Sequence, residues 1–143
     1  SVSVPPQLGS LLMRLMTSLL VILSTLISSA AFAQTYAYGP SEVTLYGTLI
    51  SAPGETPDGA KITYPALELV LPITVSSTPG DELFEPTEKG VMLIHLALDK
   101  ETADQFVQLK GRRIAATGNL FHSDNGHHQT DVLLLVKALS AAR

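Results

Sequence analysis

Three of the chain's four histidines lie in one short polar segment, residues 122–130 (HSDNGHHQT). Imidazole and carboxylate groups are good ligands for zinc, copper and nickel. The candidate ligands of such a metal are His122, Asp124, His127 and His128. Zinc or another divalent metal is the one cofactor that these residues suggest, and the chain is otherwise expected to need none.

The same segment also fits two other interpretations. As a polar ligand site it offers His127, His128 and Thr130, together with Tyr64 from a loop expected over 51–65. As a plain hairpin turn it needs no ligand, because Asp-Asn-Gly is an ordinary turn sequence. Successive residues of an extended chain point in opposite directions, so His127 and His128 would not easily bind one metal together. The residues alone leave the three interpretations open.

Strands must hold this segment at both ends, and the apolar pattern predicts a mainly β domain. Apolar runs bounded by Gly and Pro are typical of strands, and one stretch has helical spacing. The expected strands span 43–50, 66–75, 91–98, 112–121 and 131–139, and the helix spans 99–110. This order, with the helix between strands three and four, is that of the OB-fold, a five-stranded Greek-key barrel. The alternative is an open meander with the helix packed against it.

Single residues predict local features of these elements. Gly47 indicates a bulge or a sharp bend in the first strand, and Pro72 places the second strand at an edge or a break. Thr102 and Gln105 fit a capping box at the start of the helix, and Gly111 fits its end.

The remaining segments are expected to be irregular. Residues 51–65 and 76–90 read as two long loops, and Pro57-Asp58-Gly59 marks a turn within the first of them. Residues 34–41 read as a flexible polar leader.

Residues 11–33 have the pattern of a secretory signal peptide. Their only charge is Arg14, and an apolar run over 19–27 is followed by small residues that end in Ala-Phe-Ala. Cleavage is therefore expected after Ala33. An uncleaved membrane anchor is the alternative, but a spanning helix needs about 20 apolar residues, and this segment reaches that length only by including Arg14.

This interpretation sets the expected domain organisation and location. Translation would start at Met13 or Met16, which makes residues 1–12 an upstream extension. The mature chain would be a single domain over 34–143, periplasmic or secreted. It would meet a membrane only through the signal peptide during export.

Composition excludes some classes of function. The chain has no cysteine, so disulfides, thiol nucleophiles and cysteine-bound metals are excluded. Its formal net charge is −4, and loss of Arg14 with the signal peptide makes it −5. Nucleic acid is bound through clustered Lys and Arg. The only basic pair is Arg112-Arg113, so nucleic acid is not an expected partner.

No familiar catalytic motif occurs in the chain. It contains no nucleophile elbow, phosphate-binding loop, dinucleotide fingerprint or H-E-x-x-H sequence. His95 lies in an apolar run and is expected to be a half-buried structural histidine. The chain is therefore expected not to be an enzyme.

Four stretches together carry a resemblance to a known family: V-T-L-Y-G-T-L (43–49), Y-P-A-L-E-L-x-x-P-I (64–73), L-K-G-R-R-I-A-A-T-G-N-L-F (109–121) and G-H-H-Q-T-D-V-L-L (126–134). They resemble the domain-of-unknown-function family 4431, a group of small exported bacterial domains. The resemblance implies a location and a domain extent of about 43–139, and no chemistry. It directs attention to His127, His128 and Thr130. Members often carry cysteines, which this chain lacks.

The sequence thus predicts an exported, non-enzymatic binding module. The expected contacts come from the 51–65 and 122–130 loops, and the expected partner is a small polar ligand, an envelope component or a partner protein. The alternative is a metal-binding protein that uses the histidines of the 122–130 loop.

Overall fold

A computed structural model describes residues 33–142 of the chain. These residues form six strands and one helix: β1 (Gln34–Ala37), β2 (Val43–Glu55), β3 (Lys61–Ser76), β4 (Glu88–Ala97), α2 (Lys100–Leu109), β5 (Arg113–His122) and β6 (Val132–Ala141). The expected signal peptide lies outside the described residues. Within residues 33–142, no helix has the length and apolar character needed to cross a membrane.

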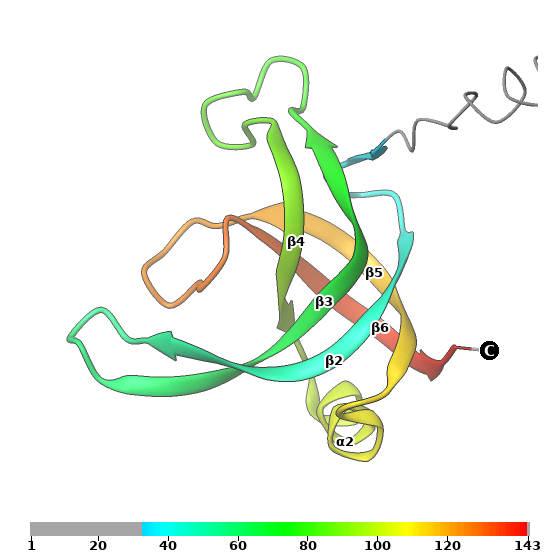
Figure 1. The fold of residues 1–143 in the computed structure, drawn as a ribbon. Helices are drawn as coiled ribbons and strands as arrows, with labels where there is room; N and C mark the ends of the chain where they lie inside the picture. The colour runs from blue at the N-terminus through cyan, green and yellow to red at the C-terminus, as the bar shows by residue number, and fades with distance from the viewer. Residues whose placement is uncertain (1–32, 143) are drawn as a thin grey trace, which may run out of the picture. The chain divides into compact units, whose positions relative to one another are not determined.

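The strands close into a barrel. The sheet has the order β1-β3-β2-β5-β6-β4, and a further pairing of β3 with β4 joins its two sides. β4 and β6 run parallel, whereas the other barrel strands pair antiparallel (Figure 1). The expected OB-like barrel is confirmed. Because the short β1 precedes the five barrel strands, α2 follows the fourth strand of the chain rather than the third.

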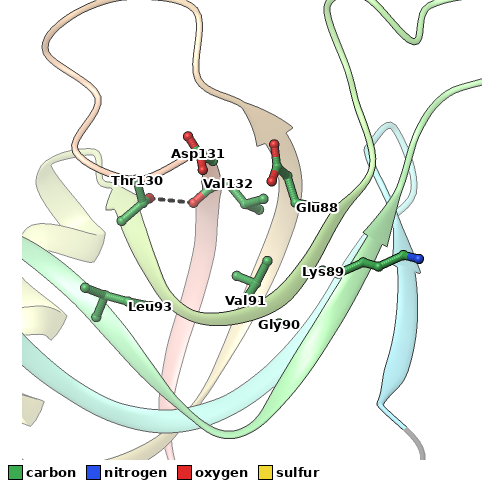
Figure 2. Close-up of a pocket in the computed structure, with 8 residues that line it drawn as sticks. All are labelled: Glu88, Lys89, Gly90, Val91, Leu93, Thr130, Asp131 and Val132. Atoms are coloured by element: carbon green, nitrogen blue, oxygen red, sulfur yellow. Dashed lines mark hydrogen bonds between the residues drawn. The ribbon is translucent and has the colours of Figure 1, made fainter.

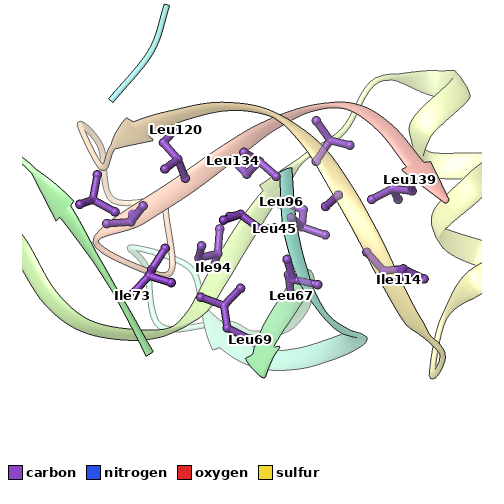
Figure 3. Close-up of a cluster of buried hydrophobic side chains, with 14 of the residues drawn as sticks. Leu45, Leu67, Leu69, Ile73, Ile94, Leu96, Ile114, Leu120, Leu134 and Leu139 are labelled. Atoms are coloured by element: carbon purple, nitrogen blue, oxygen red, sulfur yellow. The ribbon is translucent and has the colours of Figure 1, made fainter. Parts of the chain in front are cut away.

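Apolar side chains from all five barrel strands meet inside the barrel (Figure 3). Leu45, Leu67, Ile94, Ile114 and Leu134 are each no more than 1% exposed. Burying one such side chain contributes roughly 1.5–3 kcal/mol, so this core is the main source of stability in a domain without disulfides.

A second, smaller apolar cluster lies on the outer face of the barrel. It consists of Ala52, Tyr64 and Ala66, with Ile50 and Leu93 packed against it. The cluster forms because alternate residues of a strand face opposite sides of the sheet. It gives the outer face of β2, β3 and β4 a packing surface of its own.

Gly47 marks the point where three strands come closest. It pairs with β3 through Leu69 and with β5 through Ile114. A Cβ atom at Gly47 would lie 2.2 Å from the carbonyl oxygen of Glu68. The sequence predicted a bulge or a sharp bend here, but the pairing of β2 is in register on both sides of Gly47, and what requires the glycine is the close approach of two backbones.

Three expectations about the irregular segments were wrong. Residues 34–41 are not a flexible leader, because β1 pairs with β3 and Tyr38 is 4% exposed. The Tyr38 hydroxyl donates a hydrogen bond to the Pro86 carbonyl at 2.7 Å.

Residues 51–65 are not a long loop, because β2 and β3 stay paired as far as Glu55 and Lys61. The second loop, expected over residues 76–90, ends at residue 87, because β4 begins at Glu88.

The helix cap also differs from the expected one. The capping box joins Asp99 to Thr102, whose backbone N–H donates to the Asp99 carboxylate at 2.8 Å. Gln105 instead accepts a hydrogen bond from the Leu139 backbone at 3.0 Å, which ties α2 to β6. Asp99 takes the N-cap because a carboxylate at that position accepts from the open N–H groups of the first turn. Gly111 ends the helix with a φ of 84°, as expected.

Gly47→Ala should destabilise the domain by roughly 2 kcal/mol or more, because the added methyl group must displace a backbone carbonyl. Urea unfolding monitored by circular dichroism measures this change. Ser51→Ala is the matched control: Ser51 is exposed on the same strand, and its loss should change the unfolding free energy by less than about 0.5 kcal/mol. Equal effects of the two substitutions would contradict the close approach at Gly47.

Candidate functional site

The β5–β6 loop, residues 123–131, folds over a row of side chains on the outer face of the barrel. Strand register places Ala66, His95, Leu133 and Phe121 next to one another across β3, β4, β6 and β5. The ring of His128 reaches this row from the loop, with its centroid 6.3 Å from that of His95 and 5.6 Å from that of Phe121. Leu133 is 1% exposed although it lies on the outer face.

Gln129 fastens the loop to the β2–β3 hairpin. Its side-chain oxygen accepts a hydrogen bond from the Glu55 backbone N–H at 3.0 Å, and its side-chain nitrogen donates to the Glu55 carbonyl at 2.9 Å. The amide thus pairs with Glu55 as a strand residue would. We call this pair of hydrogen bonds the Gln129 latch. At the tip of the loop, Gly126 lies against Pro57 of the hairpin turn.

Thr130 joins the loop to β4 and to the start of β6. Its hydroxyl oxygen accepts a hydrogen bond from the His95 backbone N–H at 3.0 Å, and its hydroxyl donates to the Val132 carbonyl at 2.6 Å. The Gln129 backbone N–H donates to Nδ1 of His95 at 3.2 Å. An imidazole that accepts at Nδ1 is neutral, in agreement with a pKa of His95 that burial and the nearby His128 lower.

Of the sequence-predicted ligand residues, three are occupied by contacts within the domain. Tyr64 is 7% exposed and stacks against His95 with ring centroids 4.8 Å apart. His128 and Thr130 make the contacts described above. His127 alone points to solvent, near Asp58 of the hairpin turn. The role of these four residues in ligand binding stays a prediction.

The candidate metal ligands are spread over the loop. Nδ1 of His128 lies 3.4 Å from an Asp124 carboxylate oxygen, whereas His122 pairs with Glu88. Within residues 33–142, no three His, Asp or Glu side chains come close enough together to hold a metal ion. Metal binding by His122, Asp124, His127 and His128 stays an untested prediction.

His122 links the end of β5 to the start of β4. Its Nε2 atom lies 3.0 Å from the Glu88 carboxylate, and its Nδ1 atom lies 3.0 Å from the Ser123 carbonyl. Burial lowers the pKa of His122, but the hydrogen bonds to Glu88 and Ser123 and the nearby Asp131 charge outweigh it and leave the pKa raised. The sequence carries no signal for this pair, because its members are 34 residues apart.

A cleft of about 280 Å³ opens between the first half of β4 and the end of the β5–β6 loop. Figure 2 shows its lining: Glu88, Lys89, Gly90, Val91, Leu93, Thr130, Asp131 and Val132. The cleft has apolar walls at Val91, Leu93 and Val132, with the two carboxylates at one side. The Lys89 side chain extends away from the other lining side chains (Figure 2).

A second, apolar hollow lies beside β5 and β6. Its lining consists of Gly39, Pro40, Glu85, Asn119, Leu120, Phe121 and Leu135. Leu135 is 52% exposed, and Leu83 and Phe84 of the β3–β4 loop are 84% and 72% exposed. Exposed apolar residues near a polar cleft are typical of surfaces that meet a partner.

The fold and the site define a small OB-like barrel with an open cleft beside its β5–β6 loop. Residues 93–140 match the family described as "Domain of unknown function (DUF4431)". The resemblance seen in the sequence is thereby confirmed for the part of the chain from β4 to β6, which includes His127, His128 and Thr130. A search of curated proteins gave no match to the chain.

Gln129→Ala should remove both hydrogen bonds of the latch and destabilise the domain by roughly 1 kcal/mol, the net contribution of such bonds where water can replace them. Urea unfolding measures the loss. Gln129→Glu keeps the acceptor for the Glu55 N–H but sets a carboxylate oxygen against the Glu55 carbonyl, so it should not restore the stability that the alanine variant loses. An unchanged midpoint for the alanine variant would show that the latch does not hold the loop.

The His122–Glu88 pair should make stability depend on pH. A raised folded-state pKa means that protonated His122 stabilises the fold below about pH 6.5, and that this stabilisation is lost as pH rises through the raised pKa. The lowered pKa of His95 acts in the opposite sense, so that His95 costs stability as pH falls below about 6.5.

His122→Gln isolates the first effect. The difference in unfolding free energy between wild type and His122→Gln should be larger at about pH 5.5 than at about pH 8. The exposed His127→Gln variant is the control and should follow the wild-type pH profile. A pH-independent difference for His122→Gln would show that the pair does not gain from protonation.

Proposed function

We propose that this domain is an exported, non-enzymatic binding module, and that its binding site is the cleft between β4 and the β5–β6 loop. The observation that carries the proposal is the cleft itself, whose one wall is fixed by the latch and by Thr130. In OB-folds, the second and third barrel strands and the loops beside them bind ligands. The corresponding strands here are β3 and β4, and the corresponding loops are the hairpin turn and residues 123–131.

The chemistry of the site supports binding rather than catalysis. The imidazoles of His95 and His128 are used in ring packing and in hydrogen bonds to the loop backbone, and that of His122 pairs with Glu88 at the edge of the cleft. The cleft offers apolar walls, carboxylates and strand backbone. These groups fit a small polar ligand, an envelope component or a segment of a partner protein.

The location of the binding site also refines the sequence prediction. The 51–65 and 122–130 segments were expected to contact the ligand directly. We propose that they act mainly as a support, because Gln129 and Gly126 already hold the loop against the hairpin. Thr130 belongs both to the ligand-contacting surface and to the support, since it lines the cleft and anchors the loop.

Two-dimensional ¹H–¹⁵N NMR of the full-length chain tests the proposal with three probes. An N-acetylglucosamine trisaccharide represents an envelope glycan, trilysine represents a basic peptide, and zinc chloride tests the metal alternative. The glycan or the peptide should shift the amide signals of Gly90, Leu93 and Asp131. Shifts with zinc alone, at His127 and His128, would favour the metal alternative, and no shift in the cleft with any probe would contradict the proposal.

A further inference from the structure

β4 has a strand edge that its neighbour β6 does not cover. Ten residues form β4, but only His95, Leu96 and Ala97 pair with β6. On its other side, β4 pairs with β3 as far as Glu88. Among the described residues, the stretch 88–94 therefore has a strand on one side only. This stretch forms one wall of the cleft.

The direction of the His95 amide fixes the direction of the groups along this edge. The His95 N–H donates to Thr130, on the side of β6. Antiparallel pairs alternate between hydrogen-bonded and non-hydrogen-bonded, and Leu93 lies two positions before His95 in an unbroken register. The N–H and C=O of Leu93 therefore also point away from β3 and into the cleft.

The cleft runs along β4 from Leu93 to Gly90, and the space beside Gly90 is open. Gly90 has a φ of 66°, and a Cβ atom built there would meet no heavy atom within 4 Å. Val91, Leu93 and Val132 supply an apolar surface beside the exposed backbone. Open strand edges of this kind bind extended peptides, which gain affinity from main-chain hydrogen bonds and specificity from side-chain contacts.

Charge around the cleft selects among such peptides. Glu88 and Asp131 line the cleft, while the Lys89 side chain points away from it (Figure 2). The carboxylates of Glu88 and Asp131 thus lie in the same cleft, where they favour a cationic side chain.

We infer that the cleft binds an extended peptide segment carrying a lysine or arginine, which adds as a strand to the β4 edge at Leu93 and places its cation beside Glu88 and Asp131. This inference rests on the proposed function and names the class of partner. The peptide backbone would exchange hydrogen bonds with the N–H and C=O of Leu93. The latch and Thr130 would hold the opposite wall in place.

A phage-displayed library of random seven-residue peptides, selected on the immobilised full-length chain, supplies the probes. Selected peptides should be rich in Lys or Arg flanked by residues with high strand propensity. Each is then synthesised with a single backbone N-methyl group at successive positions. N-methylation at every second position should weaken binding roughly tenfold or more, because it removes an N–H donor that faces the β4 edge. N-methylation at the intervening positions, whose N–H groups face away from β4, should have little effect.

Two pairs of protein variants test the same geometry by changing the domain instead of the peptide. Leu93→Pro removes the N–H that faces the cleft and should weaken binding, whereas Leu93→Ala keeps it and should bind more tightly than the proline variant. If Leu93→Pro fails to fold, the N-methyl series decides the question. Asp131→Asn should weaken the binding of Lys peptides roughly threefold, and Asp124→Asn, an exposed loop carboxylate outside the cleft, should not.

The outcomes separate this inference from the proposed function. Selected peptides that bind equally well after N-methylation at every position would overturn strand addition, while cleft shifts in the NMR experiment would keep the binding module. A library that yields no binder would overturn a peptide as the partner. Selected peptides without basic residues, unaffected by Asp131→Asn, would overturn the assigned role of the carboxylates.

Discussion

Three residue pairs, His95–Leu133, Leu96–Leu134 and Ala97–Leu135, join β4 to β6 and so complete the barrel. The pairs are parallel and few, whereas β5 and β6 pair along nearly their whole length. Because this contact is short, it determines both where the barrel is closed and where it stays open. It encloses the apolar core at one end, and at the other it leaves the first half of β4 separated from β6 by a cleft.

A barrel with so short a closing contact needs other connections at its open end. Thr130 caps the first uncovered amide of β4, and the Gln129 latch ties the β5–β6 loop to the hairpin. The His122–Glu88 pair spans from β5 to β4. Each connection consists of one or two hydrogen bonds between polar groups. Together they hold the walls of the cleft in place and leave the cleft itself open. Polar residues that the sequence singled out, such as Thr130 and His122, therefore support the walls of the cleft.

The sequence was sufficient for the fold because the core follows simple periodicity. Apolar runs predicted all five barrel strands, and Gly111 predicted the end of the helix, whereas its capping box was placed on the wrong pair of residues. β1 was missed because Gln34–Ala37 has only four residues, too few to show a pattern, and it is held by the edge of β3 and by the buried Tyr38. The extension of β2 and β3 to a tight hairpin was missed because Pro53 and Pro65 argued for a loop.

The candidate site was predictable only in part. The sequence singled out the H-H-Q-T segment, and its role in ligand binding stays a prediction. The contacts that the segment makes depend on His95 and Glu55, which are distant in sequence. Gln129 carried no signal of its own, since a glutamine in a polar loop is ordinary and only the structure brings its amide to the Glu55 backbone. The β4 edge could not be foreseen either, because it arises from the register of two strands and not from any residue type.

Amide hydrogen exchange along β4, followed by NMR in the absence of any ligand, tests the uncovered edge most directly. The account predicts that the Leu93 amide exchanges roughly a hundredfold faster than the Ile94 amide, which faces β3, and faster than the His95 amide, which Thr130 caps. Protection of Leu93 equal to that of Ile94 would show that the edge is already covered, and would contradict the cleft as a place for an added strand.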